Sequence, residues 1–433
     1  MKRQMASVVM VLTMATGLIG CGGGADHASA PNEVKIQFMH QQVEQERQDI
    51  VAAIIAQFEK ENPGITVEAI PVNEDDYDSK IVALGGSGEL PAVIEYSQDQ
   101  AKTSVTNQFT DVDAVKAVIE EKGEDAFFEG ALEVLKTEDG NDYVGVPIAG
   151  WVQGIWVNQA MLTEKGLDLP QNWDDLLVIA AAFHDPANKK FGIALPTADT
   201  AFTEQVFSQY ALSNNANVFG KDGQITFDTP QMREALAFYK ELASYSMPGS
   251  TEVADVKDAF VGKNAPMAMY STYILNAVVK AGFINDLALV LPSNDQEAAY
   301  GSITTLGIAS GMDPEKTAAA KKFVSFLLED EHNIEWLHMA PGGVQPVLVS
   351  VNGSEAYEDN DAIKQFAHLS DGIAAAFENL QLFGTVDGKN FMIMGDITNK
   401  GIISKTVNNI VVQNADIDKE IQAAQAAIEG LVK

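Results

Sequence analysis

The sequence predicts an α/β protein, because strand-like and helix-like patterns alternate along a chain of globular composition. Of the 433 residues, 46% are hydrophobic and 21% are charged, which is the balance of a folded chain and not of a disordered one. Short β-prone runs are followed by amphipathic helices, the pattern that is typical of α/β architecture. The length allows two or three domains with substantial hydrophobic cores.

The N-terminus predicts a secretion signal with a lipid attachment site. Lys2 and Arg3 precede an uncharged, mostly apolar stretch that is too short to span a membrane. It ends in Leu18-Ile19-Gly20-Cys21, which resembles the lipobox of bacterial lipoproteins and implies that Cys21 is acylated. The alternative is an ordinary signal peptide with a chance cysteine. We expect a signal peptide over 1–20, a flexible Gly/Ala/Ser-rich tether over 21–31, and a lipid-anchored protein outside the cytoplasmic membrane.

The first half of the chain predicts three strands and a long helix. Apolar residues recur at helical spacing from Glu44 to Glu61, and Asn62-Pro63-Gly64 ends this helix. The expected strands are 34–38, 65–69 and 92–96. Gly85 to Gly88 precede the last of these, and no Gly-Lys-Ser/Thr follows them, so they predict a turn and not a phosphate loop.

The second half continues the alternation. We expect strands over 191–195, 266–270, 287–291 and 303–309. We expect helices over 229–245, 313–328 and 416–432, the first opened by Pro230.

Charge and residue counts exclude several classes of function. The chain has 28 Lys and Arg against 61 Asp and Glu, a net charge of −33, and so disfavours nucleic-acid binding. With Cys21 as the single cysteine, no intrachain disulfide or Cys-ligated metal centre is expected. The six histidines show no metal spacing, and no Gly-x-Ser-x-Gly or His-Glu-x-x-His motif occurs. We therefore expect no metal, no cofactor and no catalysis, although a glycosidase carboxylate pair is compatible with the composition.

Six segments together resemble the extracellular solute-binding proteins of ABC importers, in the carbohydrate-binding branch. They occur in family order, and members usually have Asp where this chain has Ala92. The segments are 56–67 (AQFEKENPGITV), 88–93 (GELPAV), 145–158 (from GVP to VN), 166–176 (GLDLPQNWDDL), 260–269 (FVGKNAPMAM), and 318–328 with 342–347 (GGVQPV).

The resemblance implies a two-lobe periplasmic-binding-protein fold, or Venus flytrap, with hinge strands between the lobes. Lobe one is expected to comprise 32–147 plus 302–342, and lobe two 148–301 plus 343–433. The ligand is expected in the cleft between them, where it stabilises a closed form that docks on ABC permease subunits. The expected protein is a monomer in the periplasm or at the cell surface.

The arginine count favours a neutral ligand. Once the signal peptide is removed, only Arg47 and Arg233 remain, and anionic ligands commonly recruit guanidinium groups. Arg233 is expected to be solvated on its helix. Neutral mono- or oligosaccharides are instead held by aromatic faces and by polar groups in a largely apolar pocket. The alternative is a cationic ligand such as a polyamine, which the acidic bias and the aromatic residues would suit.

Trp151 is the first candidate ligand contact, because it follows Gly150 outside a clear strand pattern, where the resemblance places the start of the cleft. Trp156, Trp173 and Trp336 are expected to be buried. Strand ends, where ligands gather in open α/β sheets, and loops supply further candidates. These are His40, Gln41, Tyr96, Gln98, Asp99, Thr200, Tyr270, Tyr273, Ser302, Gly342 and Gly343. Asp99 could instead cap a helix, and the glycine pair could instead serve a hinge turn.

Overall fold

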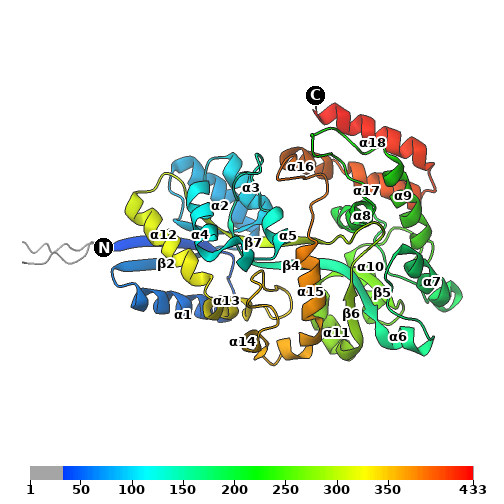
Figure 1. Ribbon diagram of the computed structural model, residues 1–433, viewed down its shortest axis with the longest axis horizontal. Coiled ribbons are helices and arrows are strands. Elements are labelled where there is room, and N and C mark those ends of the chain that lie inside the picture. The colour runs from blue at the N-terminus through cyan, green and yellow to red at the C-terminus, as the bar shows by residue number, and fades with distance from the viewer. Residues whose placement is uncertain (1–32, 433) are drawn as a thin grey trace, which may run out of the picture.

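The computed structural model describes residues 33–432, and a single path of hydrogen-bonded strands runs through it (Figure 1). The strand order is β2-β1-β3-β7-β4-β5, with β6 also paired to β4. The strands are β1 (Val34–His40), β2 (Ile65–Pro71), β3 (Val93–Ser97), β4 (Val146–Asn158), β5 (Met267–Ser271), β6 (Leu287–Val290) and β7 (Tyr300–Ile308). The predicted signal peptide, Cys21 and the tether lie outside the described residues.

Helices surround this path at both ends of the molecule (Figure 1). In the first half they are α1 (Gln45–Glu61), α2 (Glu74–Ser87), α3 (Gln98–Thr106), α4 (Val112–Lys122), α5 (Glu129–Glu133), α6 (Gln159–Glu164), α7 (Trp173–Phe183) and α8 (Ala201–Ser213). In the second half they are α9 (Pro230–Ala243), α10 (Val253–Val261), α11 (Leu275–Ala281), α12 (Pro314–Leu327), α13 (Asp330–Leu337), α14 (Glu355–Glu358), α15 (Ser370–Glu378), α16 (Phe391–Asn399), α17 (Ile402–Val411) and α18 (Ile417–Val432).

Two long antiparallel strands connect the two halves of the molecule. β4 pairs with β7 from Val146 to Gln153, and from Gln153 onward it pairs with β5. β7 pairs on its other side with β3, which is parallel to β1. The crossings predicted at residues 147 and 302 therefore fall within β4 and β7. The carboxyl ends of β1 and β3 point toward the second half of the molecule, where a cleft is expected.

Most predicted elements are confirmed within a residue or two of their expected bounds. The strand predicted over 191–195 is the exception, because only Ala194 forms a bridge, to Ala268 of the short strand β5. The glycine cluster is not a free turn either. Gly85 to Ser87 form the last turn of α2, and Gly88 ends the helix in the left-handed conformation. Gly85 is needed there, because a Cβ atom would overlap the ring of Phe109.

The buried side chains form two clusters. One lies around β1 to β3 and extends along the hinge to α15, and the other fills the space between α7, α8, α9, α17 and α18. Trp156, Trp173 and Trp336 are buried, as predicted. Trp156 also donates from Nε1 to the backbone oxygen of Tyr270 at 2.8 Å, which links β4 to β5.

The C-terminal segment contacts both halves of the molecule. α14 packs on α13, and α15 packs on α5, β4 and β6, whereas α17 packs on α8 and α9. In Figure 1, α15 stands between the two halves beside the hinge strands. Among residues 33–432, no helix is both long enough and apolar enough to cross a bilayer.

Candidate functional site

A cavity of about 480 Å³ lies between α3 of lobe one, α8 of lobe two and the C-terminal segment around α16. Tyr300, at the start of hinge strand β7, forms part of its wall. The wall residues are Gln98, Asp99, Thr103, Ala201, Glu204, Gln205, Ser208, Tyr300, Leu382, Phe383, Thr385, Phe391, Met392, Met394, Gly395, Asp396, Thr398 and Asn399. This set mixes apolar and aromatic groups with hydroxyls, amides and carboxyls and contains no Lys or Arg.

The rings of Tyr273, Trp151 and Tyr300 lie in a row along the hinge, and Tyr300 reaches the cavity. Trp151 is half-buried, its ring centroid 5.8 Å from that of Tyr300 and 6.4 Å from that of Tyr273. Trp151 pairs with Ser302 and Gln153 pairs with Tyr300, so these four side chains share one face of the two-stranded ribbon. The expectation that Trp151 lies outside a strand is wrong, because it sits in the middle of β4.

The opposite face of the hinge ribbon is closed by α15. A Cβ atom on Gly150 would come within 2.8 Å of the Phe377 ring, and Phe377 is fully buried. Trp151 and Tyr300 lie on the other face of the ribbon, away from α15. Tyr273 keeps 56% of its surface exposed, so this row is open to solvent at one end.

Helix α8 contributes a stripe of polar side chains to the cavity. Ala201, Glu204, Gln205 and Ser208 follow the spacing of one helix face. Glu204 is 6% exposed, and burial raises its pKa to about 7. One of its oxygens accepts a hydrogen bond from the Thr398 hydroxyl, while the other has no protein partner. Such a buried carboxyl group is available to a ligand that donates hydrogen bonds.

Helix α3 forms the lobe-one wall. Ser97 begins it with a capping box, accepting from the backbone nitrogen of Gln100, so Ser97 and not Asp99 is the N-cap residue. Gln98 is buried and accepts from the backbone nitrogen of Ile303 at 3.4 Å, whereas Asp99 is exposed. The surrounding protein raises the pKa of the Asp99 carboxyl, and the charge of Lys102 opposes this rise.

A contact between the two lobes lies next to the cavity, with whose wall it shares Phe391. The Nζ atom of Lys102 lies 4.6 Å from the centre of the Phe391 ring, and the backbone nitrogen of Asn390 donates to Glu138 at 2.8 Å. Gly388, at φ 79°, packs against the backbone of Thr137. We call this contact between 137–140 and 387–391 the clasp.

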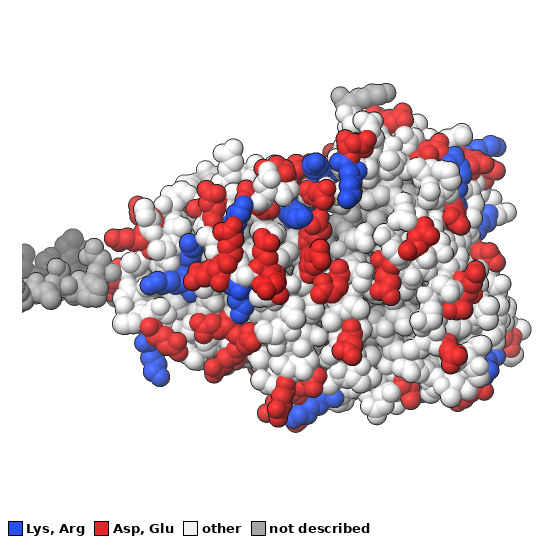
Figure 2. Space-filling view, viewed as in Figure 1, with Lys and Arg blue, Asp and Glu red and all other residues white. Residues whose placement is uncertain are grey.

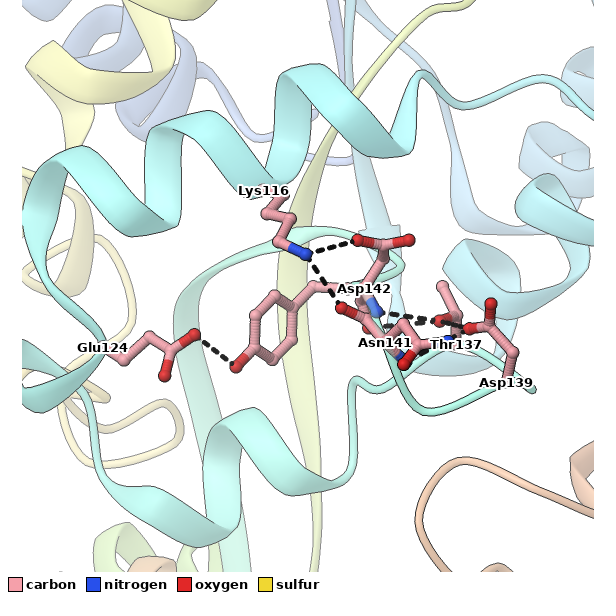
Figure 3. A network of polar contacts seen from close by, with 7 residues as sticks. Lys116, Glu124, Thr137, Asp139, Asn141 and Asp142 are labelled. Carbon is pink, nitrogen blue, oxygen red and sulfur yellow. Dashed lines mark hydrogen bonds and ion pairs between the residues drawn. The ribbon is translucent and has the colours of Figure 1, made fainter.

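Hydrogen bonds from α4 and within the loop fix the lobe-one loop of the clasp (Figure 3). Lys116 donates from α4 to Asp142 at 2.9 Å and to the backbone oxygen of Asn141 at 3.0 Å. Within the loop, Thr137 and Asn141 both donate to Asp139, and these bonds lower the pKa of Asp139 to about 2. The segment around Gly388 therefore packs on a loop that these hydrogen bonds fix.

Among the candidates chosen from sequence, Gln98 and Asp99 line the cavity, and Trp151, Tyr273 and Ser302 lie on the hinge leading to it. Tyr96 and His40 do not reach it with their side chains. Tyr96 is 1% exposed and its hydroxyl accepts from Ser104. His40 is also 1% exposed, and burial lowers its pKa to about 4.

The other candidates lie around the same cleft. Thr200 precedes α8, and its buried hydroxyl has no protein partner. Tyr270 packs its ring on Phe202 at 6.0 Å. Gly343 accepts from the Thr272 hydroxyl at 3.0 Å, and a side chain there would overlap the Tyr273 ring. Gln41 directly follows β1. Gly342 has a φ of 82°, which fits a turn that needs glycine.

Sequence reasoning missed Tyr300, Glu204 and the segment from Leu382 to Asn399 in the cavity wall. Tyr300 could have been found from the sequence, because it lies two residues before the candidate Ser302. Alternate residues of a strand share one face, so Tyr300 lies on the same face as Ser302 and opposite Gln153. The C-terminal segment carried no local signal, because it reaches α3 only through tertiary packing.

Arg233 lies at the surface, as predicted, and also has partners that the sequence did not indicate. It forms ion pairs with Asp228 and with Asp418 of α18, the latter at 2.7 Å. These contacts join α9 to α18 away from the cavity. Figure 2 shows acidic side chains spread widely over one face of the molecule, with fewer basic ones. Within 33–432, no group of three or more His, Cys, Asp or Glu is arranged to hold a metal.

Comparison with known families gives the same assignment as the six sequence segments. The model of the bacterial extracellular solute-binding proteins matches residues 43–334. The chain belongs to this family. Its members are binding proteins and not enzymes, and the resemblance stated from the sequence is confirmed at this level.

Three relatives and neighbours show how far the likeness of this solute-binding protein extends. The putative ABC transporter periplasmic-binding protein YcjN of Escherichia coli is 45% identical over 424 residues, 98% of each chain. The maltotriose-binding protein of Pyrococcus abyssi is 24% identical over 52% of this chain and 48% of its own. The cyclic α-maltosyl-1,6-maltose binding protein of Arthrobacter globiformis superposes with a TM-score of 0.76 at 18% identity, over 93% of this chain and 100% of its own. The predicted two-lobe fold is confirmed.

Proposed function

We propose that this protein captures a neutral mono- or oligosaccharide between its lobes and delivers it to the permease subunits of an ABC importer. One observation carries the proposal. A row of aromatic rings leads into a cavity whose wall has hydroxyls, amides and carboxyls and no Lys or Arg. Aromatic faces and hydrogen-bond acceptors suit a ring with apolar CH surfaces and many hydroxyl donors.

The division into lobes 32–147 plus 302–342 and 148–301 plus 343–433 belongs to this proposal. Ligand bound between α3 and α8 would contact both lobes and so favour the closed form that the permease recognises. The names of the relatives support an importer role and sugar ligands. The monomeric state, and the site in the periplasm or at the cell surface, are parts of the same proposal.

Thermal melting of residues 22–433 against a ligand panel tests the ligand class. The panel contains monosaccharides, polyols, maltotriose and other glucosides, amino acids and polyamines. A ligand that binds only the folded state adds about 2.7 kcal/mol of stability at a hundred times its dissociation constant. A rise in the midpoint with a neutral sugar supports the proposal, and a response to polyamines alone contradicts it.

A cationic ligand is the second candidate, because three carboxyl groups line the cavity. These are Asp99, Glu204 and Asp396. Against it, burial raises the pKa of Glu204 to about 7 and so disfavours its charged form, whereas a site for a cation is expected to hold carboxylates ionised. The sugar is therefore our first choice.

Lipid attachment at Cys21 is a separate part of the proposal. The Leu18-Ile19-Gly20-Cys21 segment supports it. We expect the full chain, expressed in its bacterial host, to fractionate with membranes, and the Cys21→Ser variant to appear in the soluble envelope fraction. A wild-type protein found only in the soluble fraction would contradict lipid attachment.

A further inference from the structure

A carboxyl group without a directly bonded cation lies in the core of lobe one. Glu95, in the middle of β3, is 5% exposed. Burial raises its pKa to about 7, and the hydrogen bonds that it accepts limit the rise. Burying such a group costs free energy unless its oxygens are satisfied. The partners that satisfy it show what this residue does.

Both hydrogen bonds come from the segment that follows β1 at the cleft. The Oε2 atom of Glu95 accepts from the backbone nitrogen of Gln41 at 2.8 Å, and Oε1 accepts from the side-chain Nε2 of Gln42 at 2.9 Å. The side-chain oxygen of Gln42 in turn accepts from the guanidinium Nη1 of Arg47 at 3.2 Å. A continuous series of polar contacts therefore leads from the core to α1.

This series ends at the first turn of α1, which carries Arg47. The positive charge of Arg47 also acts on Tyr273, where it opposes the rise in pKa caused by burial. The Tyr273 ring lies against Trp151.

We propose that Glu95 is a positioning residue, which fixes the segment Gln41–Gln42 after β1 and, through Gln42, the guanidinium of Arg47 at the start of α1. An ionised carboxylate accepts both bonds at once. When it is protonated, one oxygen carries a hydrogen that points toward a donor, and one of the two bonds is lost. The consequence for ligand binding rests on the proposed function, whereas the fixing of the segment does not.

The other groups that face Glu95 keep one protonation state near neutral pH. His40 is held neutral by burial, which lowers its pKa to about 4, and its Nδ1 accepts from the backbone nitrogen of Gln42. Tyr77 of α2 donates its hydroxyl to the backbone oxygen of Glu95 at 2.7 Å, and burial raises its pKa. Burial also raises the pKa of Tyr96 to about 12. Glu95 is thus the group whose charge changes around pH 7.

The charged form of Glu95 fixes the segment Gln41–Gln42 but lowers the stability of the fold. Because the folded-state pKa is raised above the ordinary value of 4.5, this carboxyl group lowers stability as the pH rises from about 4.5 through 7. Replacing it with glutamine should therefore leave the melting midpoint at pH 8 unchanged or higher. A residue with a purely structural role would show the opposite result.

Nuclear magnetic resonance of residues 22–433 tests the fixing of the segment without any ligand. In the wild type, the backbone amide of Gln41 and the side-chain amide of Gln42 should titrate with one shared midpoint near pH 7. In Glu95→Gln both titrations should disappear, and the protection of the Gln41 amide against hydrogen exchange should fall by about tenfold. Glu204→Gln is the matched control, because it removes the other carboxyl group with a pKa of about 7 and should leave both titrations in place.

Two results would overturn the inference. One is a Gln41 amide in the wild type that does not titrate between pH 5 and 9. The other is the same titration and the same protection in Glu95→Gln as in the wild type.

Binding of maltotriose to the same variants measures the consequence for ligand separately. We expect a roughly tenfold weaker affinity in Glu95→Gln at pH 8, and a wild-type affinity that falls between pH 8 and pH 6. If wild type and Glu95→Gln bind maltotriose equally well while the wild-type amides of Gln41 and Gln42 still titrate, the segment is fixed but lies outside the ligand contacts. This result would overturn its placement at the site. Absence of maltotriose binding to wild type excludes maltotriose as the ligand, while the resonance result still decides the role of Glu95.

Discussion

The clasp between the lobes offers a perturbation whose size follows from the geometry. Gly388→Ala places a Cβ atom onto the carbonyl oxygen of Thr137, at a residue with φ of 79°. A non-glycine residue in this region costs about 1–2 kcal/mol. Moving Gly388 away to relieve the overlap also removes the bond from Asn390 to Glu138, a further ~0.5–1.5 kcal/mol.

The interlobe part of this loss is the Asn390–Glu138 bond and part of the attraction between Lys102 and Phe391, together about 1–2.5 kcal/mol, because the backbone strain is present in the separated form too. Such a loss changes the ratio of clasped to separated molecules by roughly 5- to 60-fold. The segment should swing away from lobe one, and the interlobe distances should lengthen and spread.

Pulsed electron paramagnetic resonance of residues 22–433, which contain no cysteine, can measure these distances. Spin labels at Val82→Cys and Val178→Cys use exposed positions on α2 and α7, one in each lobe. Gly395→Ala is the control on α16, because its Cβ atom would meet nothing within 4 Å. Gly223→Ala adds the same positive φ in open space and measures the backbone strain alone.

An unchanged distance distribution in Gly388→Ala would refute the reasoning. So would an equal shift in the two control variants, because the overlap with Thr137 would then not be the cause.

Three further predictions concern single side chains. Trp151→Ala should weaken binding of the sugar found in the melting panel by tenfold or more, about 1.4 kcal/mol; isothermal calorimetry measures this, and unchanged affinity in a folded variant removes Trp151 from the site. Glu204→Gln should raise the free energy of unfolding at pH 8 by up to about 3 kcal/mol, because burial raises the pKa of Glu204 to about 7. The variant should also lose less stability between pH 4.5 and 7. Chemical denaturation at several pH values measures this, and an unfolding free energy that falls with pH as steeply as in the wild type would contradict it. Gly192→Ala should destabilise lobe two by several kcal/mol, because its Cβ atom would overlap the backbone of Ala180; a melting midpoint within about 1 °C of wild type would show that the backbone yields.

Local patterns were enough to predict most of the strands and helices. The spacing of Ile50, Val51, Ile54, Ile55 and Phe58 predicts the buried face of α1. The last four side chains are buried in the structure, and Ile50 is half-buried. The strand predicted over 191–195 was wrong for a reason that the pattern does not contain. Ile193, Ala194 and Leu195 are buried, but β5 forms only one bridge with the segment, at Ala194.

The site was less predictable, because it depends on distant segments. Trp151 could be chosen as the residue after Gly150, but its ring neighbours Tyr273 and Tyr300 come from later parts of the chain. Glu204 looks like any polar residue of a helix until its burial is known. Which lobe-one helix meets α16 depends on packing across nearly 300 residues, and a local pattern carries no information about it.

The position of β7 in the sheet has a consequence for how the chain acquires its structure. β7 lies between β3 and β4, and Val93 pairs with Ile308, more than 200 residues later. Pairings of such long separation slow folding, because an extended loop must close before any contact is gained. The N-terminal half therefore cannot complete its sheet during export until residue 308 has emerged. Until then the edge of β3 stays unpaired, open to proteases and to aggregation.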